Sequence, residues 1–206
     1  MVTVGITGGI GSGKTTVCNI WEQLGACVLN ADDLAKEIMA TNPEVKRELI
    51  ETFGSQTFLE DGSLNRKYLA NEAFNKGRVK ELNAIVHPRI PSAAAHKMRK
   101  AEESGTSVFV YEAALLLENL EPGDLDYIVL VLADKERRLK RVQQRDDSTL
   151  SDIEQRMEKQ RDFEKAIEHV DYVIRNNGTL EELKKKAEVI YQNFLPLSEN
   201  NENYFH

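Results

Sequence analysis

Cysteine and positive charge are both scarce in this chain of 206 residues. There are two cysteines, Cys18 and Cys27. The chain has 27 lysine and arginine residues but 34 aspartate and glutamate residues, which gives a net charge of −7. Two cysteines form no disulfide framework and have no partners at metal-ligand spacing, so we expect two reduced, packed thiols. An acidic chain is a poor general binder of nucleic acid, because phosphate backbones require clustered lysine and arginine.

Long apolar runs are also missing. No stretch approaches the roughly 20 apolar residues needed to cross a bilayer. The chain enters an apolar strand pattern at Val2 with no basic leader before it, so no secretory signal is expected. A hydrophobic content of 41% suffices to bury the core of one compact domain with insertions. These features favour a cytoplasmic enzyme without membrane or nucleic-acid partners, and they leave open whether it is a monomer or a homo-oligomer.

Short apolar runs alternate with stretches of helical periodicity, which indicates an α/β fold. Strands are predicted over Val2–Thr7, Ala26–Leu29, Val108–Tyr111, Tyr127–Leu132 and Val170–Ile174. Helices are predicted over Lys14–Leu24, Asp32–Met39, Pro43–Phe53, Arg66–Phe74, Arg78–Val86, Pro88–Glu103, Lys135–Arg145, Leu150–Phe163 and Thr179–Phe194. The alternation predicts a parallel sheet with helices on both faces, in three α/β/α layers.

The helical patterns divide unevenly along the chain. Residues 42–103 are almost entirely helical and interrupt the strand pattern, so they are expected to form an inserted subdomain. The core then comprises residues 1–41 and 104–196, with a helical lid at about 135–165. Ser151 and Glu154 fit a capping box at the second lid helix. The polar, Asn-rich tail at 197–206 is expected to be disordered.

The stretch Gly8–Thr15, GGIGSGKT, fits the phosphate-binding pattern G-x-x-x-x-G-K-[ST] between a predicted strand and a predicted helix. Glycines let successive backbone N–H groups point at phosphate oxygens, and the helix adds the positive end of its dipole. Lys14 is expected to reach the β- and γ-phosphates of ATP, and the Thr15 hydroxyl to ligate Mg²⁺. The candidate ATP-binding residues of this loop are Gly9, Gly11, Ser12, Gly13, Lys14, Thr15 and Thr16.

Three alternatives for this loop are disfavoured. A glycine-rich turn that binds nothing does not require the Lys-Thr pair. A dinucleotide-binding fingerprint needs glycine or alanine where Lys14 stands. A GTPase switch needs N-K-x-D and D-x-x-G motifs, but Asn75-Lys76 is followed by Gly77-Arg78, and no aspartate has a glycine three residues later. A P-loop kinase remains.

Acidic residues end two of the apolar runs. Phosphorylating an alcohol requires a group that orients the hydroxyl and accepts its proton, and Asp32 is the candidate base. Helix capping is the alternative for Asp32, and a role as a cap or first-turn acid of the next helix is preferred for Asp33. Glu112 follows Val108–Tyr111, where it either contributes to the Mg²⁺ site or faces solvent.

Three arginines, Arg137, Arg141 and Arg145, share one helix face at spacings of four residues. Arginines on a closing lid can neutralise the charge of a migrating phosphoryl group. The alternative is a solvated face with ordinary surface ion pairs. For the cluster as a whole, the spacing favours a lid.

With these residues in place, the chain closely resembles the dephospho-coenzyme A kinase family from Val2 to about Phe194. The segments that carry the resemblance are Ile6–Lys14 (ITGGIGSGK), Asn30–Asp32 (NAD), His87–Pro88 (HP), Glu112–Glu118 (EAALLLE), Arg141–Asp146 (RVQQRD), Arg156–Gln160 (RMEKQ) and Asp171–Asn176 (DYVIRN). Two positions depart from the family pattern. Asn30 stands where the family commonly has aspartate, and Ala114 where it often has proline.

The resemblance implies that ATP, with Mg²⁺, phosphorylates the ribose 3′-hydroxyl of dephospho-coenzyme A in the final step of coenzyme A biosynthesis. It also implies that the inserted helical subdomain holds the substrate. The implied roles are base for Asp32, phosphate clamp for Lys14, lid arginines for Arg141 and Arg145, adenine-side loop for Asn176, and substrate contacts for His87 and Leu116. The alternatives are another P-loop kinase, with a nucleoside or shikimate-like acceptor, and a nucleotide-binding regulatory protein without acceptor chemistry.

Overall fold

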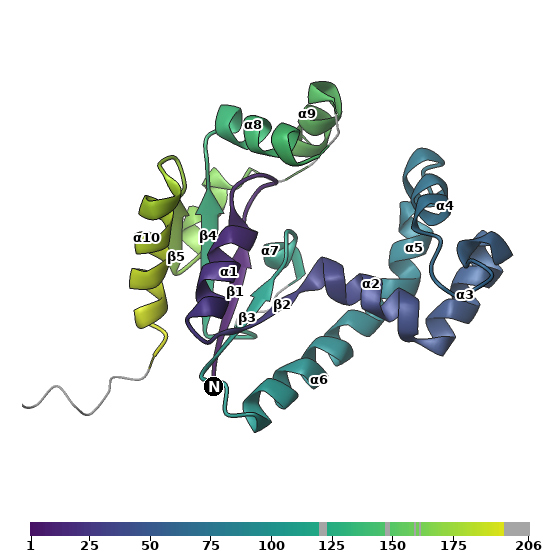
Figure 1. Cartoon of the computed structure of the whole chain (residues 1–206), viewed down its shortest axis with the longest axis horizontal. Helices are drawn as coiled ribbons and strands as arrows, with labels where there is room; N and C mark the ends of the chain where they lie inside the picture. The colour runs from purple at the N-terminus through teal and green to yellow at the C-terminus, as the bar shows by residue number, and fades with distance from the viewer. Residues whose placement is uncertain (120–122, 147–148, 159, 161, 196–206) are drawn as a thin grey trace, which may run out of the picture. The chain divides into compact units, whose positions relative to one another are not determined.

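A computed structural model describes residues 1–119, 123–146, 149–158, 160 and 162–195 (Figure 1). It forms two compact units, one made of residues 1–28 with the described residues from Ala101 on, and the other of residues 29–100. The tail at 197–206 lies outside the described residues. None of the helices described combines the length and the apolar composition needed to cross a bilayer.

Five strands form one sheet in the first unit and at its boundary. The sheet has the order β2-β3-β1-β4-β5, and the strands are β1 (Val2–Thr7), β2 (Cys27–Asn30), β3 (Val108–Glu112), β4 (Tyr127–Leu132) and β5 (Tyr172–Arg175). β1 runs parallel to β3 and β4, and β5 runs parallel to β4. In this register Ile6 lies opposite both Glu112 and Val129, one residue before β1 ends. Backbone pairing therefore fixes the positions of β3 and β4 relative to the end of β1, where the glycine-rich loop begins.

The two faces of the sheet are covered by different elements. On β4, Val129 and Val131 pack into a cluster with residues of α1 (Lys14–Gln23) and α10 (Leu180–Gln192). Leu130 and Leu132 pack into a second cluster with Phe163 and the 3₁₀ turn η4 (Glu164–His169). Because alternate residues of a strand point to opposite faces, the sheet lies between two layers of helical segments. The predicted three-layer α/β/α fold is confirmed.

Trp21 holds α1 against α10. Its side chain is fully buried, and Nε1 donates a hydrogen bond to the carbonyl oxygen of Ala187 at 2.8 Å. The ring of Phe194 lies nearly perpendicular to it, with the ring centroids 5.5 Å apart. Burial of a side chain this large contributes roughly 2–3 kcal/mol to folding, so the helix that follows the glycine-rich loop is firmly anchored.

The second unit consists of helices built by strong local signals. Asn42 caps α3 (Pro43–Phe53) by accepting from the N–H groups of Glu44 and Val45, and Gly54 ends that helix with a φ of 92°. The unit begins at Leu29 whereas the sequence predicted 42, because α2 (Ala31–Thr41) packs on α3 and α5. Its other elements are η1 (Ser55–Thr57), α4 (Arg66–Ala70), the π-helical turn η2 (Asn71–Asn75), α5 (Val79–Val86), η3 (His87–Arg89) and most of α6 (Ile90–Glu103).

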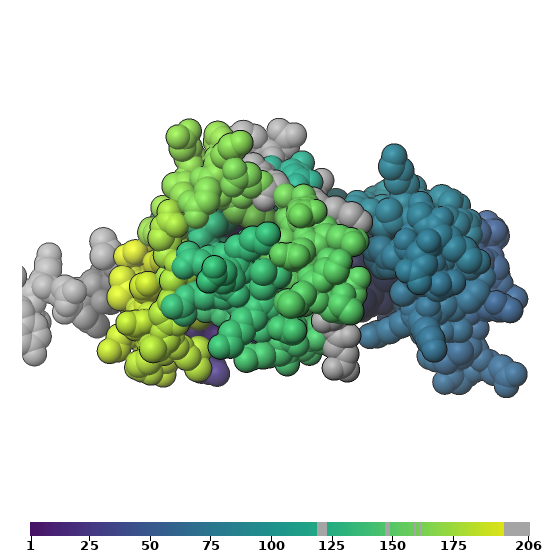
Figure 2. Space-filling model, turned by 90° about the horizontal axis from the view of Figure 1, so that it is seen from above, coloured from purple at the N-terminus to yellow at the C-terminus, as the bar shows by residue number. Residues whose placement is uncertain are grey.

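Two charged helices, α8 (Lys135–Arg145) and α9 (Leu150–Glu158), pack on the glycine-rich loop. The buried Val142, Ile153 and Met157 form a small core with Ile10. In the view from above, α8 and α9 lie on the near face of their unit, beside α10 (Figure 2). The remaining short helix of this unit is α7 (Leu116–Asn119).

The predicted capping box of α9 is wrong. The Thr149 hydroxyl accepts from the Asp152 N–H at 3.2 Å, and it donates to the Asp152 carboxylate at 2.7 Å. Ser151 and Glu154 lie two residues farther along, inside the first turns of the helix. Thr149 has the side chain suited to the cap position just before the helix, and it takes that role.

Candidate functional site

The loop between β1 and α1 depends on glycine at several positions. Gly8, Gly11 and Gly13 have φ angles of 146°, 75° and 104°, a region that other residues rarely adopt. A Cβ atom at Gly11 would lie 2.7 Å from the carbonyl oxygen of Arg138, and one at Gly13 would overlap the side-chain amide of Asn176. Substitution at these positions would therefore force either the loop or its packing partners to move.

Ser12 carries an unsatisfied hydroxyl group inside this loop. The residue is 1% exposed, and its Oγ has no hydrogen-bond partner among the described residues. An unpaired buried hydroxyl costs about 1–3 kcal/mol, which a bound acceptor would recover. The first N–H groups of α1 have no acceptor within the helix either, and the helix dipole favours an anion there. The loop thus fits a phosphate group.

Lys14 folds back over the loop. Its Nζ donates to the carbonyl oxygens of Gly8 at 2.7 Å and of Gly9 at 3.4 Å, and the side chain is half-buried. A lysine in this position keeps its ammonium group within the loop that also offers the Ser12 hydroxyl. The arrangement concentrates positive charge where phosphate oxygens would lie.

Thr15 and Glu112 form a hydrogen-bonded pair next to the loop. The Thr15 hydroxyl donates to Oε1 of Glu112 at 3.0 Å, and Glu112 is 5% exposed. Burial raises the pKa of the Cys18 thiol well above its usual range, and the charge and hydrogen bond of Glu112 raise it further, so Cys18 stays protonated. Within the described residues, no group of three or more His, Cys, Asp or Glu side chains could hold a metal by itself. Thr15 and Glu112 fit Mg²⁺ as two hard oxygen ligands, not as a complete cage.

Arg141 and Asn176 hold the loop through hydrogen bonds to its backbone carbonyl oxygens. The Asn176 side-chain amide donates to the carbonyl oxygen of Ser12 at 2.7 Å, and Arg141 Nη2 donates to the Asn176 carbonyl oxygen at 2.9 Å. Arg141 Nη1 also donates to the carbonyl oxygens of Gly11 and Ser12, at 3.3 and 3.4 Å. Burial, followed by the nearby charge of Arg137, lowers the pKa of Arg141. The structure therefore brings both residues to the phosphate loop.

Arg145 makes a local ion pair instead. Its side chain is 63% exposed, and Nε lies 2.8 Å from the carboxylate of Asp146, which is also 3.6 Å from Arg156. The hydrogen bond from Arg145 lowers the pKa of Asp146. In this structure Arg145 forms a surface ion pair, which was the alternative to a lid role for this residue.

Asp32 lies in the helical unit, in the first turn of α2. The cap position of this helix is occupied by Asn30, whose side-chain oxygen accepts from the Asp33 N–H at 3.0 Å. Asp33 pairs with Lys36 at 2.7 Å. Asp32 is exposed, and its carboxylate has no hydrogen bond or ion pair with any described residue. Helix capping is therefore wrong for Asp32, and Asp33 is a first-turn acid of α2, as predicted, but not its cap. The Asp32 carboxylate is available to another partner.

The two predicted substrate contacts lie in different environments. His87 is exposed at the start of η3, in the helical unit. Leu116 is 2% exposed, in the other unit, and a Cβ atom on Gly5 of β1 would lie 2.6 Å from its side chain. A side chain enclosed in this way cannot touch a ligand in this conformation. The contact of Leu116 with substrate stays a prediction, and in this conformation Leu116 packs against β1.

Sequence reasoning missed two residues that contact the loop, Arg138 and Gln160. Arg138 Nε donates to the Ile10 carbonyl oxygen at 2.9 Å, and the Ile10 N–H donates to Oε1 of Gln160 at 2.9 Å. Of the predicted face of Arg137, Arg141 and Arg145, Arg141 contacts the loop, and Arg138 contacts it where Arg137 was expected. Leu139 and Val142 gave the missing signal, because an arginine beside the apolar face of α8 is the one that packs inward.

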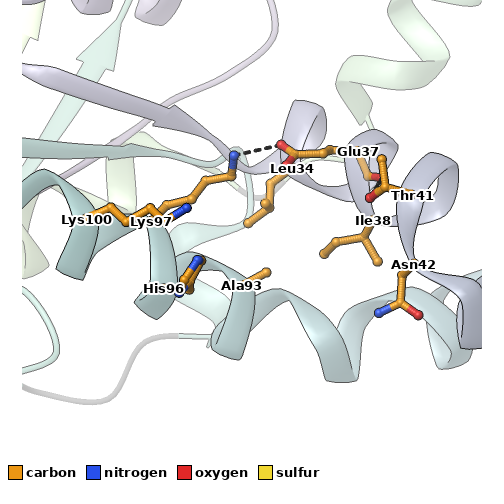
Figure 3. A pocket seen from close by; sticks show the side chains of 9 residues that line it. All are labelled: Leu34, Glu37, Ile38, Thr41, Asn42, Ala93, His96, Lys97 and Lys100. Atoms are coloured by element: carbon orange, nitrogen blue, oxygen red, sulfur yellow. Dashed lines mark hydrogen bonds and ion pairs between the residues drawn. The ribbon is translucent and has the colours of Figure 1, made fainter.

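The helical unit contains a pocket of about 390 Å³ between α2 and α6 (Figure 3). Leu34, Ile38 and Ala93 make part of its wall apolar. Glu37 and Lys97 form an ion pair of 2.8 Å across it, and His96 and Lys100 also line it. The pocket therefore combines apolar surface with cationic side chains.

Comparisons with known proteins agree over almost the whole chain. The sequence model of the family described as dephospho-CoA kinase matches residues 2–182. The dephospho-CoA kinase of Salinibacter ruber is 42% identical over 192 residues, which cover 93% of this chain and 96% of that protein. The dephospho-CoA kinase of Geobacter sulfurreducens is 39% identical over 197 residues, with coverages of 95% and 100%.

Solved structures with the same fold span the chain as well. The crystal structure of TT1252 from Thermus thermophilus matches with a TM-score of 0.75 at 29% identity, covering 95% of this chain and 98% of that one. The dephospho-CoA kinase from Campylobacter jejuni has a TM-score of 0.67 at 24% identity, with coverages of 94% and 97%, and is similar in fold.

Proposed function

The chain belongs to the dephospho-CoA kinase family, and we propose that it transfers the γ-phosphoryl group of ATP to the ribose 3′-hydroxyl of dephospho-coenzyme A. The products are coenzyme A and ADP, and the reaction is the final step of coenzyme A biosynthesis. The observation that carries the proposal is the phosphate loop, in which a buried, unpaired Ser12 hydroxyl lies with Lys14 and the Thr15–Glu112 pair. It lies within a chain that matches the family over residues 2–182.

The phosphate loop binds the triphosphate through N–H groups, the Ser12 hydroxyl and Lys14. The Lys14 ammonium exchanges the carbonyl oxygens of Gly8 and Gly9 for β- and γ-phosphate oxygens. This exchange favours the reaction because charge on the migrating phosphoryl group is then met by a fixed positive group. Asn176 supports the loop from the adenine side, through its bond to Ser12.

Thr15 and Glu112 are the residues that would hold Mg²⁺. Hydroxyl and carboxylate oxygens are ligands that this hard cation prefers. When bound, Mg²⁺ neutralises phosphate charge and orients the γ-phosphoryl group. Because Glu112 is fixed at the end of β3, its carboxylate keeps Thr15 oriented even before nucleotide binds.

Asp32 acts as the general base. Its carboxylate accepts the proton of the 3′-hydroxyl while the oxygen forms a bond to the γ-phosphorus, and the bond to ADP breaks. Two observations support this role: Asp32 is exposed without a partner among the described residues, and Asn30 performs the capping that would otherwise occupy it. Asn30 replaces the family's usual aspartate here, so Asp32 carries the acid function at this position.

Arg141 and Arg145 must first leave their present partners before they can contact the migrating phosphoryl group. Arg141 can release the Gly11 and Ser12 carbonyl oxygens, and Arg145 can release Asp146, to meet charge on the phosphoryl group. Residues 42–103, together with α2, hold dephospho-coenzyme A, with His87 among the contacts. The pocket between α2 and α6 supports this assignment, because an apolar wall with cationic side chains suits a ligand that is both apolar and anionic. The enzyme works in the cytoplasm, as a monomer or homo-oligomer.

The test is ADP formation by the purified protein with Mg-ATP and single acceptors. Turnover is expected with dephospho-coenzyme A and not with adenosine or shikimate. Asp32→Asn should lower kcat by about 100-fold or more while Mg-ATP binding stays intact. The matched control is Asp33→Asn, since this neighbouring acid is engaged by Lys36 and should leave kcat nearly unchanged.

Two results would overturn the proposal. Turnover of other alcohols but not dephospho-coenzyme A would indicate a different small-molecule kinase. Tight ATP binding without any acceptor-dependent ADP release would indicate a regulatory nucleotide-binding protein.

A further inference from the structure

Both backbone polar groups of Ile10 are bound by side chains from the lid region. The Ile10 carbonyl oxygen accepts from Arg138 Nε at 2.9 Å, and the Ile10 N–H donates to Gln160 Oε1 at 2.9 Å. Arg138 Nη2 donates to the same Gln160 oxygen at 3.4 Å. Arg138, Gln160 and Ile10 thus form a closed ring of hydrogen bonds at the phosphate loop, named here the Ile10 clamp.

The Ile10 clamp lies in a partly dry environment. Arg138 is half-buried, and this burial lowers the pKa of its guanidinium. A Cβ atom at Gly9 would lie 2.7 Å from the guanidinium carbon, so the group also covers the loop directly. The Ile10 side chain packs against the cluster of Val142, Ile153 and Met157. Hydrogen bonds in such surroundings are stronger than those exposed to solvent.

The clamp decides which N–H groups remain for a ligand. The Ile10 N–H is used by Gln160, and the Ser12 N–H donates to the Gly9 carbonyl oxygen at 3.0 Å. The donors left to a phosphate include the Ser12 hydroxyl and the first N–H groups of α1. A glycine-rich loop has many accessible conformations, and holding both polar groups of one residue removes much of that freedom before a ligand arrives.

We infer that Arg138 and Gln160 are positioning residues which preorganise the phosphate loop for the nucleotide, through both polar groups of Ile10. They act on ATP affinity and not on the transferred group, because neither bond involves a phosphate-binding donor. The inference rests on the proposed function only in that the loop binds ATP phosphates. It adds that Arg138 on α8 and Gln160, two residues after the end of α9, set the affinity of the loop for nucleotide.

The experiment measures the Kd of Mg-ATP by titration calorimetry without any acceptor, for Gln160→Leu, Gln160→Glu and Arg138→Met. Gln160→Leu removes the acceptor and should raise Kd by about 10-fold, as should Arg138→Met. Gln160→Glu keeps an acceptor for both donors and should restore Kd to within about 3-fold of the wild type. The controls are Gln155→Leu on α9 and Lys140→Met on α8, which replace exposed residues by the same kinds of change.

Steady-state kinetics separate positioning from general damage. In the full reaction, Gln160→Leu should raise KM for ATP by about 10-fold, with kcat and KM for dephospho-coenzyme A changed by less than about 2-fold. Hydrogen exchange of the Ile10 amide should become faster in Gln160→Leu and stay slow in Gln160→Glu. A merely structural role would instead lower thermal stability in all variants and weaken the binding of both substrates together.

The inference is overturned if folded Gln160→Leu and Arg138→Met bind Mg-ATP as tightly as the wild type. It is also overturned if Gln160→Glu weakens binding as much as Gln160→Leu does. Should Gln160→Leu fail to fold, Arg138→Met gives the same decision. If dephospho-coenzyme A is not the acceptor, the calorimetric test is unaffected, because it uses Mg-ATP alone. If the wild-type protein does not bind Mg-ATP, the proposed function fails, but exchange of the Ile10 amide still tests the clamp.

Discussion

The Thr15 hydroxyl donates a hydrogen bond to Oε1 of Glu112 over 3.0 Å, which joins the first turn of α1 to the end of β3. Glu112 lies opposite Ile6 in the parallel pairing of β3 with β1. The position of its carboxylate is therefore set by the sheet and not by the loop. The buried position makes Glu112 a fixed acid beside the first turn of α1.

Glu112→Gln tests the metal role of this pair. The amide keeps a hydrogen-bond acceptor for Thr15 but loses the negative charge, so the apparent affinity for Mg²⁺ should fall by about 10-fold. The measurement is initial rate against free Mg²⁺ at saturating ATP and acceptor. Glu118→Gln, an exposed acid on α7, is the control. A wild-type Mg²⁺ dependence in Glu112→Gln would exclude Glu112 from the metal site.

Lys14→Ala should lose most of kcat. The ammonium group is held over the loop by the Gly8 and Gly9 carbonyl oxygens, so it is already positioned to meet charge on the γ-phosphoryl group. Loss of one such group typically lowers kcat by about 100- to 1000-fold. Rates measured at saturating ATP separate this effect from weaker binding. Retention of kcat within about 3-fold would mean that Lys14 serves binding alone.

Gly13→Ala should disable the loop for two separate reasons. Gly13 has a φ of 104°, and an added Cβ would overlap the Asn176 amide that supports the Ser12 carbonyl oxygen. Gly105→Ala is a matched control, because Gly105 has a φ of 80° but no described atom within 4 Å of the added Cβ.

Urea denaturation and Mg-ATP titration measure the two effects. The backbone penalty alone should destabilise Gly105→Ala by about 1 kcal/mol, and Gly13→Ala should lose about 2–3 kcal/mol together with measurable ATP binding. Equal stability losses in the two variants, with ATP binding retained in both, would show that the contact between Gly13 and Asn176 has no consequence.

The parts of the site that sequence predicted well depend on local chemistry. The GGIGSGKT loop carries its own conformational requirements, since glycines supply the positive φ angles wherever the chain folds. The same is true of Asn42 and Gly54, which begin and end α3 by bonds to their own neighbours. Such features need no information from distant residues, which is why pattern and spacing suffice to predict them.

The parts that sequence predicted poorly depend on packing between distant elements. Four arginines on α8 offer more than one face, and only contact with the phosphate loop selects Arg138 and Arg141 over Arg137. Leu116 matches a family segment, but its burial against β1 follows from the fold of the whole unit. Asn30 illustrates a third case, because the substitution of an acid by an amide was visible while its capping of α2 was not.

Glu72 predicts a pH dependence of stability in the helical unit. Glu72 is 5% exposed within the π-helical turn η2, and it pairs with Lys76 at 2.5 Å and with Arg78 at 3.2 Å. Arg78 also donates to the Thr52 carbonyl oxygen and lies over the Phe53 ring, 4.5 Å from its centroid. The hydrogen bond from Lys76, opposed in part by burial, lowers the pKa of Glu72 below its ordinary value of 4.5.

A carboxyl group whose pKa is lowered by folding stabilises the protein above its unfolded pKa, and this contribution is lost as pH falls through the folded pKa. Glu72→Gln should therefore be less stable than the wild type near about pH 7, and the difference should shrink as pH is lowered toward about 3. Urea denaturation followed by circular dichroism across this range measures the difference, with the exposed Glu60→Gln as control. A difference that stays constant with pH would mean that Glu72 stabilises the unit through packing and not through its charge.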